Sequence, residues 1–430
     1  MDRNVLMIAY HFPPCVGSSG LQRTLGFSRH LPSSGWNPLI LAPHPRAYER
    51  VGDDQVDDIS SKTVIRRAFA LHASRHLGIK GRYPLWLALP DRWVSWLIGA
   101  IPTGLRLVRK YRPDVLWSTY PIASAHLIAF FLHRLTQVPW VADFRDPMNE
   151  IDPLTSERWP KNPRIWAARE WIERRTLLSC SRAVFATSSA LQIYARRYPE
   201  VPSKRLVQIA NGYSEESFSE AAIFRDCQRP TSNRLVLLHS GVLYPSPDRN
   251  PGHFFEALAA LQRLGIISPE NTRVTLRASS SENLYQKQIL EHGIAGIVKL
   301  EPPLPYKQAL AEMLDADGLL LFQGRDSNSA IPAKLYEYFR ARRPIFAMVD
   351  EAGDTCAELR RVGLGTIAPL SSTDHILAGL RDFLRKVREG ISPVMNNTEL
   401  WPHSRESKTK DLANLFDSVL QETRSTNPTA

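Results

Sequence analysis

The feature that most constrains the fold of this chain is a repeated alternation of short apolar runs with longer amphipathic stretches. Short apolar runs are typical of parallel strands, and the stretches between them are typical of crossover helices. In the first half we expect strands at Asn4–Ala9, Pro38–Ala42, Thr63–Arg66, Asp114–Ser118, Trp140–Asp143, Ala183–Thr187 and Leu206–Ile209. In the second half we expect them at Leu235–His239, Arg273–Arg277, Gly296–Leu300, Gly318–Phe322 and Pro344–Met348. Two such series predict two doubly wound, Rossmann-like α/β domains.

The chain length favours the same division, because 430 residues exceed what one hydrophobic core usually holds. We expect a first domain over residues 1–214, a polar linker over 215–233, a second domain over 234–402, and a C-terminal helix and tail over 403–430. Ligands of open α/β sheets bind beyond the carboxyl ends of the strands. We therefore expect the two domains to face each other across a ligand-binding cleft.

The net charge of +11 favours an anionic partner, such as nucleic acid, an anionic membrane or a phosphorylated ligand. The basic residues are dispersed along the chain and form no recognised nucleic-acid-binding module, so nucleic acid is not the expected partner. Charge for solubility alone is the remaining alternative. The choice therefore depends on local motifs.

Cysteine usage and the N-terminus indicate the compartment. The four cysteines lie far apart, with no CxxC pair and no metal-type spacing: Cys15, Cys180, Cys227 and Cys356. This pattern favours a reducing compartment over a disulfide scaffold or a zinc site. The N-terminus does not resemble a signal peptide, and no uncharged apolar stretch of about 18 residues is present. A cytoplasmic protein is expected.

In the first domain, the motif VADFRDP carries three charges at the end of an expected strand, namely Asp143, Arg145 and Asp146. Open α/β sheets place their ligands at such strand ends, so we favour a functional role. The alternative is an ion-pair turn whose charges satisfy one another. The loop YHFPPCVGSSG after the first strand is a weaker signal, in which Gly17 permits close backbone approach to a phosphate or serves a tight turn.

The second domain opens in the same manner. In HSGVLYPSPDRNP, Gly241 follows the expected strand and Arg249 precedes an expected helix. An arginine at this position can hold a diphosphate with two parallel hydrogen bonds. A solvated loop arginine is the alternative interpretation.

The segment SAIPAKLYEYFRARRP is the most informative in the chain. Ser329 is expected to cap a helix that contains Pro332 in its first turn. The free N–H groups of Ala330 and Ile331 would then attract a phosphate. On the same helix, Lys334 and Glu337 share one face, where the lysine can neutralise phosphates and the carboxylate can bind sugar hydroxyls. A surface ion pair is the alternative for this pair.

A tryptophan-rich segment with a basic end leaves two interpretations open. Trp86, Trp93 and Trp96 precede Arg106, Arg109, Lys110 and Arg112. Tryptophan beside basic residues is typical of a membrane interface, which predicts peripheral contact with an anionic membrane. The other interpretation is a helix packed into the first domain with a basic outer end.

Taken together, these motifs resemble the GT-B retaining glycosyltransferases of family 4, especially bacterial polysaccharide-assembly enzymes. The resemblance covers essentially the whole chain and is carried by YHFPP…G, VADFRDP, the NGY turn at 211–213, HSGVLYP and the KLYEY helix. It also includes the helix after Trp401, which in that fold crosses back onto the first domain. Each motif is loose by itself, and their common order makes the resemblance specific.

The resemblance implies that the second domain binds a nucleotide-diphosphate sugar and the first binds the acceptor, a glycan, a lipid-linked glycan or a small molecule. It implies transfer with retention, without a metal ion or a cofactor, with Arg249 and Lys334 stabilising the departing diphosphate. Glu337 matches the acid that contacts the nucleotide ribose. Gly17 matches the loop that approaches the donor phosphates, and the enzyme would work in the cytoplasm or at the inner face of the membrane.

Two departures from the family pattern leave the donor-sugar contact to other residues. The first acid of the paired-glutamate motif falls at Ser329, and the usual first-domain histidine has no counterpart, since His126 lies inside an expected helix. We predict that Asp143 or Asp146 supplies a polar contact instead. A nucleotide-sugar epimerase of the same fold and a non-catalytic sugar-nucleotide-binding subunit are the alternative functions.

Overall fold

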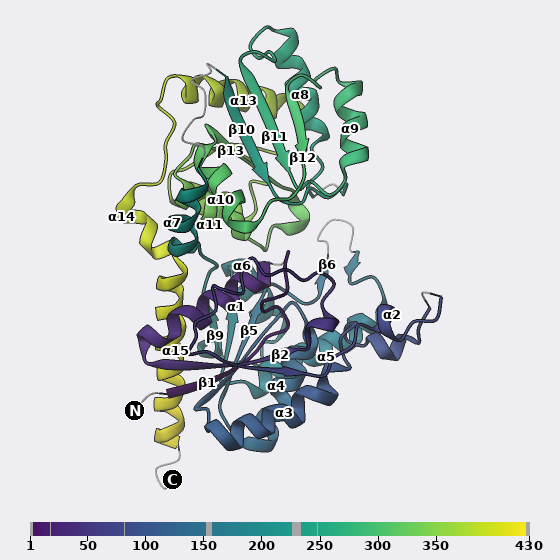
Figure 1. Cartoon of the computed structure of the whole chain (residues 1–430), viewed down its shortest axis with the longest axis vertical. Helices are drawn as coiled ribbons and strands as arrows, with labels where there is room; N and C mark the ends of the chain where they lie inside the picture. Colours follow the sequence, from purple (N-terminus) through teal and green to yellow (C-terminus); the bar gives the residue numbers. More distant parts are fainter. Residues whose placement is uncertain are drawn as a thin grey trace. The chain divides into compact units, whose positions relative to one another are not determined.

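A computed structural model describes residues 3–17, 19–80, 82–151, 157–225, 234–246 and 248–426. The chain divides into two compact units, shown in Figure 1. Unit 1 comprises Met1–Asn211 together with Arg405–Ala430, and unit 2 comprises Gly212–Ser404. Each unit has its own parallel sheet and its own core, as the alternation in the sequence predicts.

The sheet of unit 1 contains seven parallel strands among the described residues, in the order β3-β2-β1-β4-β5-β8-β9. Reversal of the strand order beside β1 defines a doubly wound sheet. A separate two-stranded antiparallel ribbon is formed by β6 (Glu150–Ile151) and β7 (Arg158–Trp159). The strands of the main sheet are β1 (Arg3–Ile8), β2 (Trp36–Pro43), β3 (Val64–Ala68), β4 (Val115–Thr119), β5 (Trp140–Arg145), β8 (Arg182–Phe185) and β9 (Leu206–Gln208).

Both faces of this sheet are covered, which explains why its strands are apolar throughout. Alternate residues of β1 enter two different cores: Leu6 and Ile8 face one, and Val5 and Met7 face the other. Helices α3, α4 and α6 contribute to the first core, and α1 and α15 contribute to the second. The helices of unit 1 are α1 (Ser19–His30), α2 (Ala73–His76), α3 (Trp96–Tyr111), α4 (Ala123–Thr136), α5 (Pro163–Ser179), α6 (Ser188–Arg197) and α15 (Arg405–Thr426).

The C-terminal helix α15 returns to unit 1 and completes its second core, as predicted from the fold resemblance. Leu412, Phe416 and Val419 are almost fully buried, and burial of each such side chain stabilises the fold by roughly 1.5–3 kcal/mol. The contact with α1 is close, since a β-carbon at Gly26 would lie 2.6 Å from the Cδ atom of Arg405. A glycine at position 26 therefore lets the two helices pack.

Unit 2 repeats the design with six parallel strands among the described residues, in the order β12-β11-β10-β13-β14-β15. These strands are β10 (Leu235–Ser240), β11 (Thr272–Arg277), β12 (Val298–Glu301), β13 (Gly318–Gln323), β14 (Ile345–Val349) and β15 (Thr366–Ala368). The helices are α7 (Glu215–Ala221), α8 (Gly252–Arg263), α9 (Glu282–Glu291), α10 (Tyr306–Asp315), α11 (Ala333–Ala341), α12 (Asp354–Arg361), α13 (Thr373–Arg388) and α14 (Asn397–Leu400).

The polar stretch expected to be a linker begins as a regular element of unit 2. Residues 215–221 form α7, because Ser214 caps the helix by accepting a hydrogen bond from the Ser217 N–H and acidic residues follow in the first turn. Phe218 is buried, so the helix has an apolar anchor despite its polar composition. A 3-10 helix continues over Ala222–Phe224, and residues 226–233 of the expected linker lie outside the described residues.

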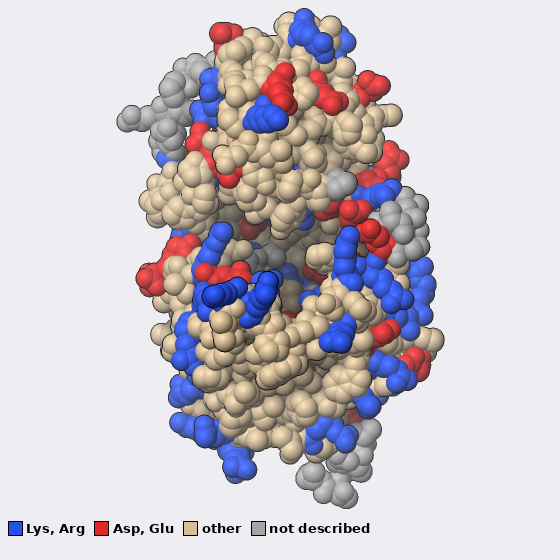
Figure 2. All heavy atoms as spheres, turned by 90° about the vertical axis from the view of Figure 1, so that its right-hand side faces the viewer, with Lys and Arg blue, Asp and Glu red and all other residues tan. Residues whose placement is uncertain are grey.

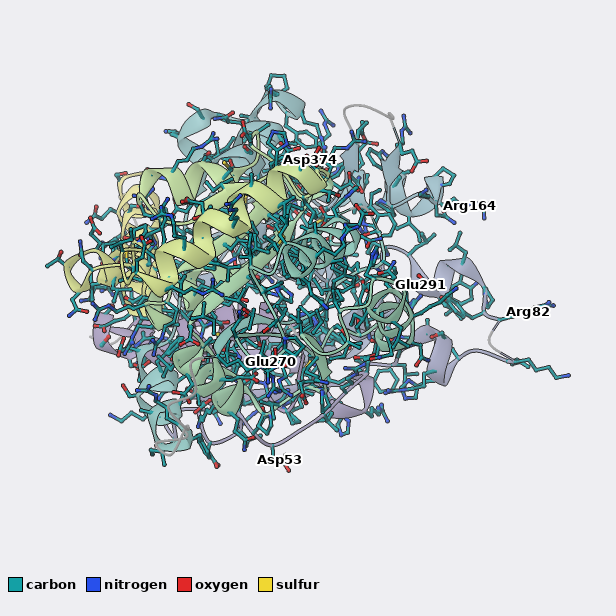
Figure 3. All side chains as sticks on the ribbon, turned by 90° about the horizontal axis from the view of Figure 1, so that it is seen from above. Asp53, Arg82, Arg164, Glu270, Glu291 and Asp374 are labelled. Atoms are coloured by element: carbon teal, nitrogen blue, oxygen red, sulfur yellow. The ribbon has the colours of Figure 1, made fainter. Side chains whose placement is uncertain are left out.

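Charged side chains lie at the periphery of both units. Those labelled in Figure 3, such as Arg164 of unit 1 and Glu291 of unit 2, are exposed and point outward. No helix in the described part of the chain is long and apolar enough to cross a membrane. Several charged groups are nevertheless buried, among them Asp143 and Arg145 at the carboxyl end of β5 and Glu337 of α11.

Candidate active site

Asp143, on β5 of unit 1, is fully buried and forms an ion pair with Arg23 of α1. Arg23 donates from Nε to Asp143 Oδ2 at 2.8 Å and from Nη2 to Oδ1 at 2.9 Å, and the Thr119 hydroxyl donates to Oδ2 at 3.0 Å. The same guanidinium donates to the carbonyl oxygens of Ile209 and Ala210. Both oxygens of Asp143 are thus bound within unit 1, in line with the ion-pair interpretation of VADFRDP, with a partner that the local sequence did not suggest.

Arg145 and Asp146 follow at the same strand end, and Arg145 is held in an unusual backbone conformation. Arg145 has a φ of 62° and lies at a register shift between β5 and β8. A non-glycine residue in this conformation costs about 1 kcal/mol or more and often occurs at functional sites. Burial raises the pKa of the Asp146 carboxyl, while the neighbouring Arg145 opposes that shift. Asp146 remains partly exposed, unlike Asp143.

His11, in the loop after β1, joins this cluster although the sequence pattern did not single it out. Burial lowers its pKa to about 3, and the positive charge of Arg145 acts in the same direction. The imidazole is therefore neutral at pH 7, and its place directly after a strand end was the available signal.

Gly17 lies farther along the same loop with a φ of 79°, and a β-carbon there would meet no atom within 4 Å. Backbone conformation, not crowding, explains this glycine.

His126 lies in α4, as expected, and is fully buried in the core of unit 1. Its Nδ1 atom is 2.7 Å from the Ser118 hydroxyl, and burial lowers its pKa to about 3. This histidine belongs to the packing between α4 and β4.

In unit 2, Lys334 of α11 reaches back to the end of β10. Its Nζ atom lies 3.3 Å from Nε2 of the fully buried His239, whose Nδ1 atom is 2.9 Å from the Leu320 carbonyl oxygen. Because a carbonyl oxygen only accepts, Nδ1 carries the proton and Nε2 accepts from the lysine. Burial, followed by the charge of Arg249, lowers the pKa of Lys334 to about 7, and Glu337 opposes the shift.

Gly241 leaves the space that Lys334 occupies. A β-carbon at Gly241 would lie 2.4 Å from Lys334 Nζ, and the φ of 132° is one that other residues rarely adopt. The backbone conformation therefore favours the glycine predicted at the strand end, and a side chain there would displace the lysine amine. This contact joins the HSGVLYP and KLYEY motifs in one site.

Arg249 completes the cationic side of this cluster. Its Nε atom lies 3.5 Å from Asp248 Oδ2, and its guanidinium stacks 5.2 Å from the centre of the Tyr244 ring. Asp248 also accepts a hydrogen bond from the Ser327 hydroxyl, and burial raises its pKa. The charge of Arg249 contributes to the lowered pKa values of both Lys334 and His239, so the three groups lie within electrostatic reach.

The predicted start of α11 is wrong. The helix begins at Ala333 with Pro332 as its N-cap, and Ser329 provides no cap. The reason is steric, since a residue before proline disfavours the helical region and keeps Ile331 out of the helix. The Ala330 N–H donates to Ser327, so it is not available to a ligand, and no hydrogen-bond partner is found for the Ile331 N–H among the described residues.

Glu337 is buried one turn after Lys334, as the spacing predicts. Tyr306, the first residue of α10, donates its hydroxyl hydrogen to Glu337 Oε1 at 2.8 Å. Sequence spacing alone did not suggest Tyr306, because α10 and α11 are far apart in the chain. The predicted residues Gly241, Arg249, Lys334 and Glu337 are therefore brought together in unit 2, with His239 and Tyr306 added.

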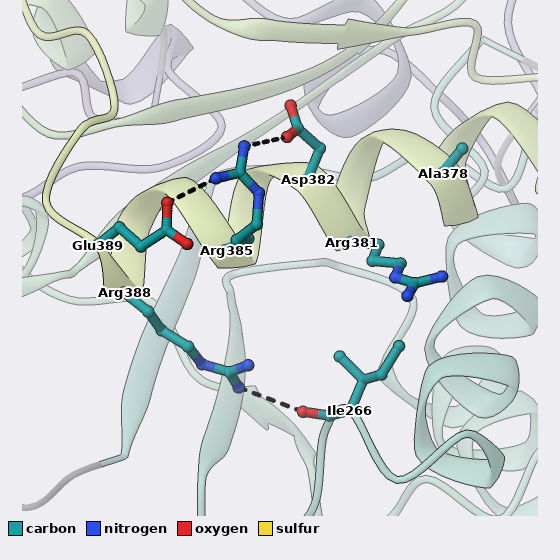
Figure 4. A pocket seen from close by; sticks show the side chains of 7 residues that line it. All are labelled: Ile266, Ala378, Arg381, Asp382, Arg385, Arg388 and Glu389. Atoms are coloured by element: carbon teal, nitrogen blue, oxygen red, sulfur yellow. Dashed lines mark hydrogen bonds and ion pairs between the residues drawn. The ribbon is translucent and has the colours of Figure 1, made fainter.

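A separate pocket of about 430 Å³ lies at the opposite edge of unit 2, beside Ile266, which precedes β11. Three arginines of α13 line it, but Arg385 pairs with Asp382 and Glu389, and Arg388 donates to the Ile266 carbonyl oxygen (Figure 4). Arg385 and Arg388 thus already have hydrogen-bond partners within unit 2. Among the described residues, no group of three or more His, Cys, Asp or Glu side chains that could hold a metal ion is found.

Comparison with known protein families gives a match within the N-terminal half of the chain. Residues 20–212 match the sequence model of the glycosyl transferase 4-like domain. No curated protein matches the sequence.

Solved structures show that the chain has the GT-B fold. HepE of Anabaena in complex with UDP and glucose aligns over 100% of both chains with a TM-score of 0.59 and 12% identity. WaaG, a glycosyltransferase of lipopolysaccharide biosynthesis, covers 99% of this chain and 100% of its own with a TM-score of 0.58 and 12% identity. A putative UDP-N-acetylglucosamine 2-epimerase of Listeria monocytogenes covers 98% of both chains with a TM-score of 0.60 and 9% identity.

Proposed function

We propose that this protein transfers a sugar from a nucleotide-diphosphate sugar to an acceptor hydroxyl, with retention of configuration and without a metal ion. In this proposal unit 2 binds the donor and unit 1 binds the acceptor, a glycan, a lipid-linked glycan or a small molecule. The reaction belongs to polysaccharide assembly in the cytoplasm. The choice of a uridine nucleotide as the first probe comes from HepE, which binds UDP and glucose.

The observation that carries the proposal is the contact between Lys334 and the neutral His239 beside Arg249. A lysine with a pKa of about 7 is only partly charged in the empty site, which limits the cost of burying an ammonium group. A diphosphate placed next to it raises that pKa, so binding of the anion draws a proton onto the lysine. The site is thus prepared to become positive when a phosphate arrives.

The same groups suit the chemistry of a departing diphosphate. As the bond between the sugar and the β-phosphate oxygen breaks, negative charge grows on that oxygen. Lys334 and Arg249 stabilise it as fixed donors, and the N–H of Ile331, just before α11, adds a neutral donor on the same side. His239 and Gly241 act through Lys334, the one by accepting its hydrogen bond and the other by leaving it space.

Two carboxylates take different roles in the proposal. Glu337, oriented by Tyr306, accepts hydrogen bonds from the hydroxyls of the nucleotide ribose. In unit 1, Asp146 makes the polar contact to substrate, because it is partly exposed, whereas both oxygens of Asp143 are bound by Arg23 and Thr119. Asp143 thus serves as a positioning residue for the strand end that carries Arg145 and Asp146.

A nucleotide-binding experiment tests the site. UDP and UDP-glucose should each raise the melting temperature of the full chain. At a ligand concentration of 100 Kd, binding adds about 2.7 kcal/mol to the free energy of unfolding. Lys334→Ala and Arg249→Ala should each weaken UDP binding at least roughly tenfold, since each removes a charge-assisted hydrogen bond. Arg381→Ala, on α13 at the opposite edge of unit 2, is the matched control and should bind normally. Equal UDP affinities in all three variants would contradict the proposed donor site.

An epimerase of the same fold is the second candidate, because the Listeria neighbour is as similar in structure as the transferases are. Incubation with UDP-N-acetylglucosamine in the absence of any acceptor separates the two reactions. Conversion of the sugar without an acceptor supports epimerisation. Release of UDP that depends on an added acceptor supports transfer, and binding without either reaction supports a non-catalytic subunit.

A further inference from the structure

The net positive charge of this protein comes from unit 1. Unit 1 holds 33 Lys and Arg residues against 20 Asp and Glu, whereas unit 2 holds 21 against 23. In Figure 2 the surface of unit 1, in the lower part of the view, accordingly shows many more basic than acidic side chains. The donor chemistry proposed for unit 2 does not account for this excess in unit 1.

Exposed apolar side chains accompany the charge on the outer side of helices α3, α4 and α5, which pack side by side. Phe131 and Leu135, one turn apart on α4, are 38% and 62% exposed. Trp171 and Leu178, two turns apart on α5, are 47% and 40% exposed. Contacts of Phe130 with both Phe131 and Trp171 join the two helices. We call this surface the helical face.

Exposed arginines lie on the same three helices. Arg106 of α3, Arg134 of α4 and Arg175 of α5 are exposed, and no acidic partner is found for them in the described part of the chain. The guanidinium of Arg175 lies 5.7 Å from the centre of the Trp171 ring. Basic and aromatic groups are thus intermixed on the helical face.

Helix electrostatics explain part of this pattern but not all of it. Cations near the C-termini of α3 and α4 complement the helix dipole, so Arg109, Lys110 and Arg134 need no ligand to be favourable. The dipole does not explain why a tryptophan, a phenylalanine and two leucines lie exposed between them. A second copy of the chain is disfavoured as the covering partner, because two identical basic faces repel each other.

The tryptophan-rich segment contributes less than its composition suggests. Trp96 is fully buried, and Trp93 is partly buried against Tyr10 and His72. Trp86 is 68% exposed. The segment therefore mostly packs into unit 1, and the exposed aromatic surface comes from α4 and α5 instead.

We propose that the helical face docks on the surface of an anionic lipid bilayer. Aromatic and leucine side chains enter the headgroup region, where Trp is favoured, and the arginines contact lipid phosphates. Each basic residue near an anionic surface strengthens binding about fivefold, so several together give measurable association. A nucleic acid is the less favourable partner, since it offers no apolar phase for Leu135 and Leu178. This proposal is independent of the sugar-transfer reaction.

Vesicle co-sedimentation of the full chain tests the proposal. Vesicles of phosphatidylglycerol and phosphatidylcholine in equal parts should bind the protein, and vesicles of phosphatidylcholine alone should not. Arg134→Gln with Arg175→Gln should weaken binding about 25-fold. The matched control is Arg263→Gln with Arg381→Gln, which removes two exposed arginines of unit 2 and should leave binding unchanged.

A second pair of variants separates a bilayer from a purely ionic partner. Leu135→Ser with Trp171→Ser should weaken vesicle binding by at least tenfold, whereas Leu264→Ser with Leu290→Ser, at two exposed leucines of unit 2, should not. Melting curves and UDP binding show that each variant is folded. The proposal would be overturned if the helical-face variants and the unit 2 control variants lost vesicle binding equally. It would also be overturned if the wild-type protein did not bind anionic vesicles. Arginine-dependent binding to duplex DNA without vesicle binding would likewise overturn it.

Discussion

The two strand-end clusters carry similar residues but use them differently. In unit 1 the buried acid at the end of β5, Asp143, is paired with Arg23 of α1, and the pair is sealed from solvent. In unit 2 the cations Lys334 and Arg249 stand near each other, and each depresses the charging of its neighbours. Buried charges that pair with each other need no ligand, whereas buried charge without a counterion lowers stability until a ligand arrives.

This difference is the reason for proposing that the cluster in unit 2 binds the anion. The charged motif VADFRDP suggested a ligand site in the sequence. Its first acid, Asp143, instead forms an ion pair with Arg23 inside unit 1. Gly241 and Lys334, from two separate motifs, form a contact that is costly without a ligand. Four predictions test the contrast, beginning with the largest expected effect.

Asp143→Ala should destabilise the protein by about 3–5 kcal/mol, because it leaves the Arg23 guanidinium buried without its partner. Urea denaturation measures this loss. The double variant Arg23→Met with Asp143→Leu should be less destabilised than Asp143→Ala, since no charge then remains buried. A loss below about 1 kcal/mol in Asp143→Ala would mean that the pair is not a structural unit.

Gly241→Ala should destabilise unit 2 by about 1–3 kcal/mol, because alanine is strained at the φ of 132°. The new methyl group also displaces Lys334 Nζ, so UDP affinity should fall together with stability. Gly265→Ala is the control: it too has a positive φ, but a β-carbon there meets no atom within 4 Å. Calorimetry should find normal UDP affinity in that control; a loss there equal to that of Gly241→Ala would argue against the lysine contact.

UDP affinity should fall as pH rises above about 7, by up to about tenfold per unit, because the empty site then holds an uncharged Lys334 that must take up a proton. Lys334→Arg should flatten this profile, since arginine keeps its charge. The sign for stability is opposite: the lysine is less basic in the folded than in the unfolded chain, so stability without ligand rises from pH 7 toward its usual pKa of 10.5. A pH-independent affinity in the wild type would contradict this assignment.

Arg385→Ala should change stability by less than about 1 kcal/mol, because its pairs with Asp382 and Glu389 are exposed on α13. UDP affinity should not change. The stability change in this variant measures the contribution of an exposed ion pair, with which the changes at the two strand-end clusters are compared. An effect on UDP binding as large as that of Lys334→Ala would move the candidate site toward the pocket beside Ile266.

Local pattern predicted the elements of the fold well, and it predicted the site in part. Apolar runs predicted the strands of the two main sheets except β15, and the family resemblance predicted the return of α15. Lys334 and Glu337 lie on one helix, as their spacing requires. The start of that helix was misplaced, because the effect of Pro332 on Ile331 outweighed the capping preference of Ser329.

The amino-acid sequence by itself determined two parallel α/β sheets and the strand ends at which polar residues collect, since periodicity and turn residues act over a few neighbours. Tertiary structure alone decided which charges meet. Arg23 reaches Asp143 across 120 positions, and Lys334 reaches His239 across 95. Whether a charge is neutralised or left for a ligand depends on such distant partners and on burial, and neither is visible in a short stretch of sequence.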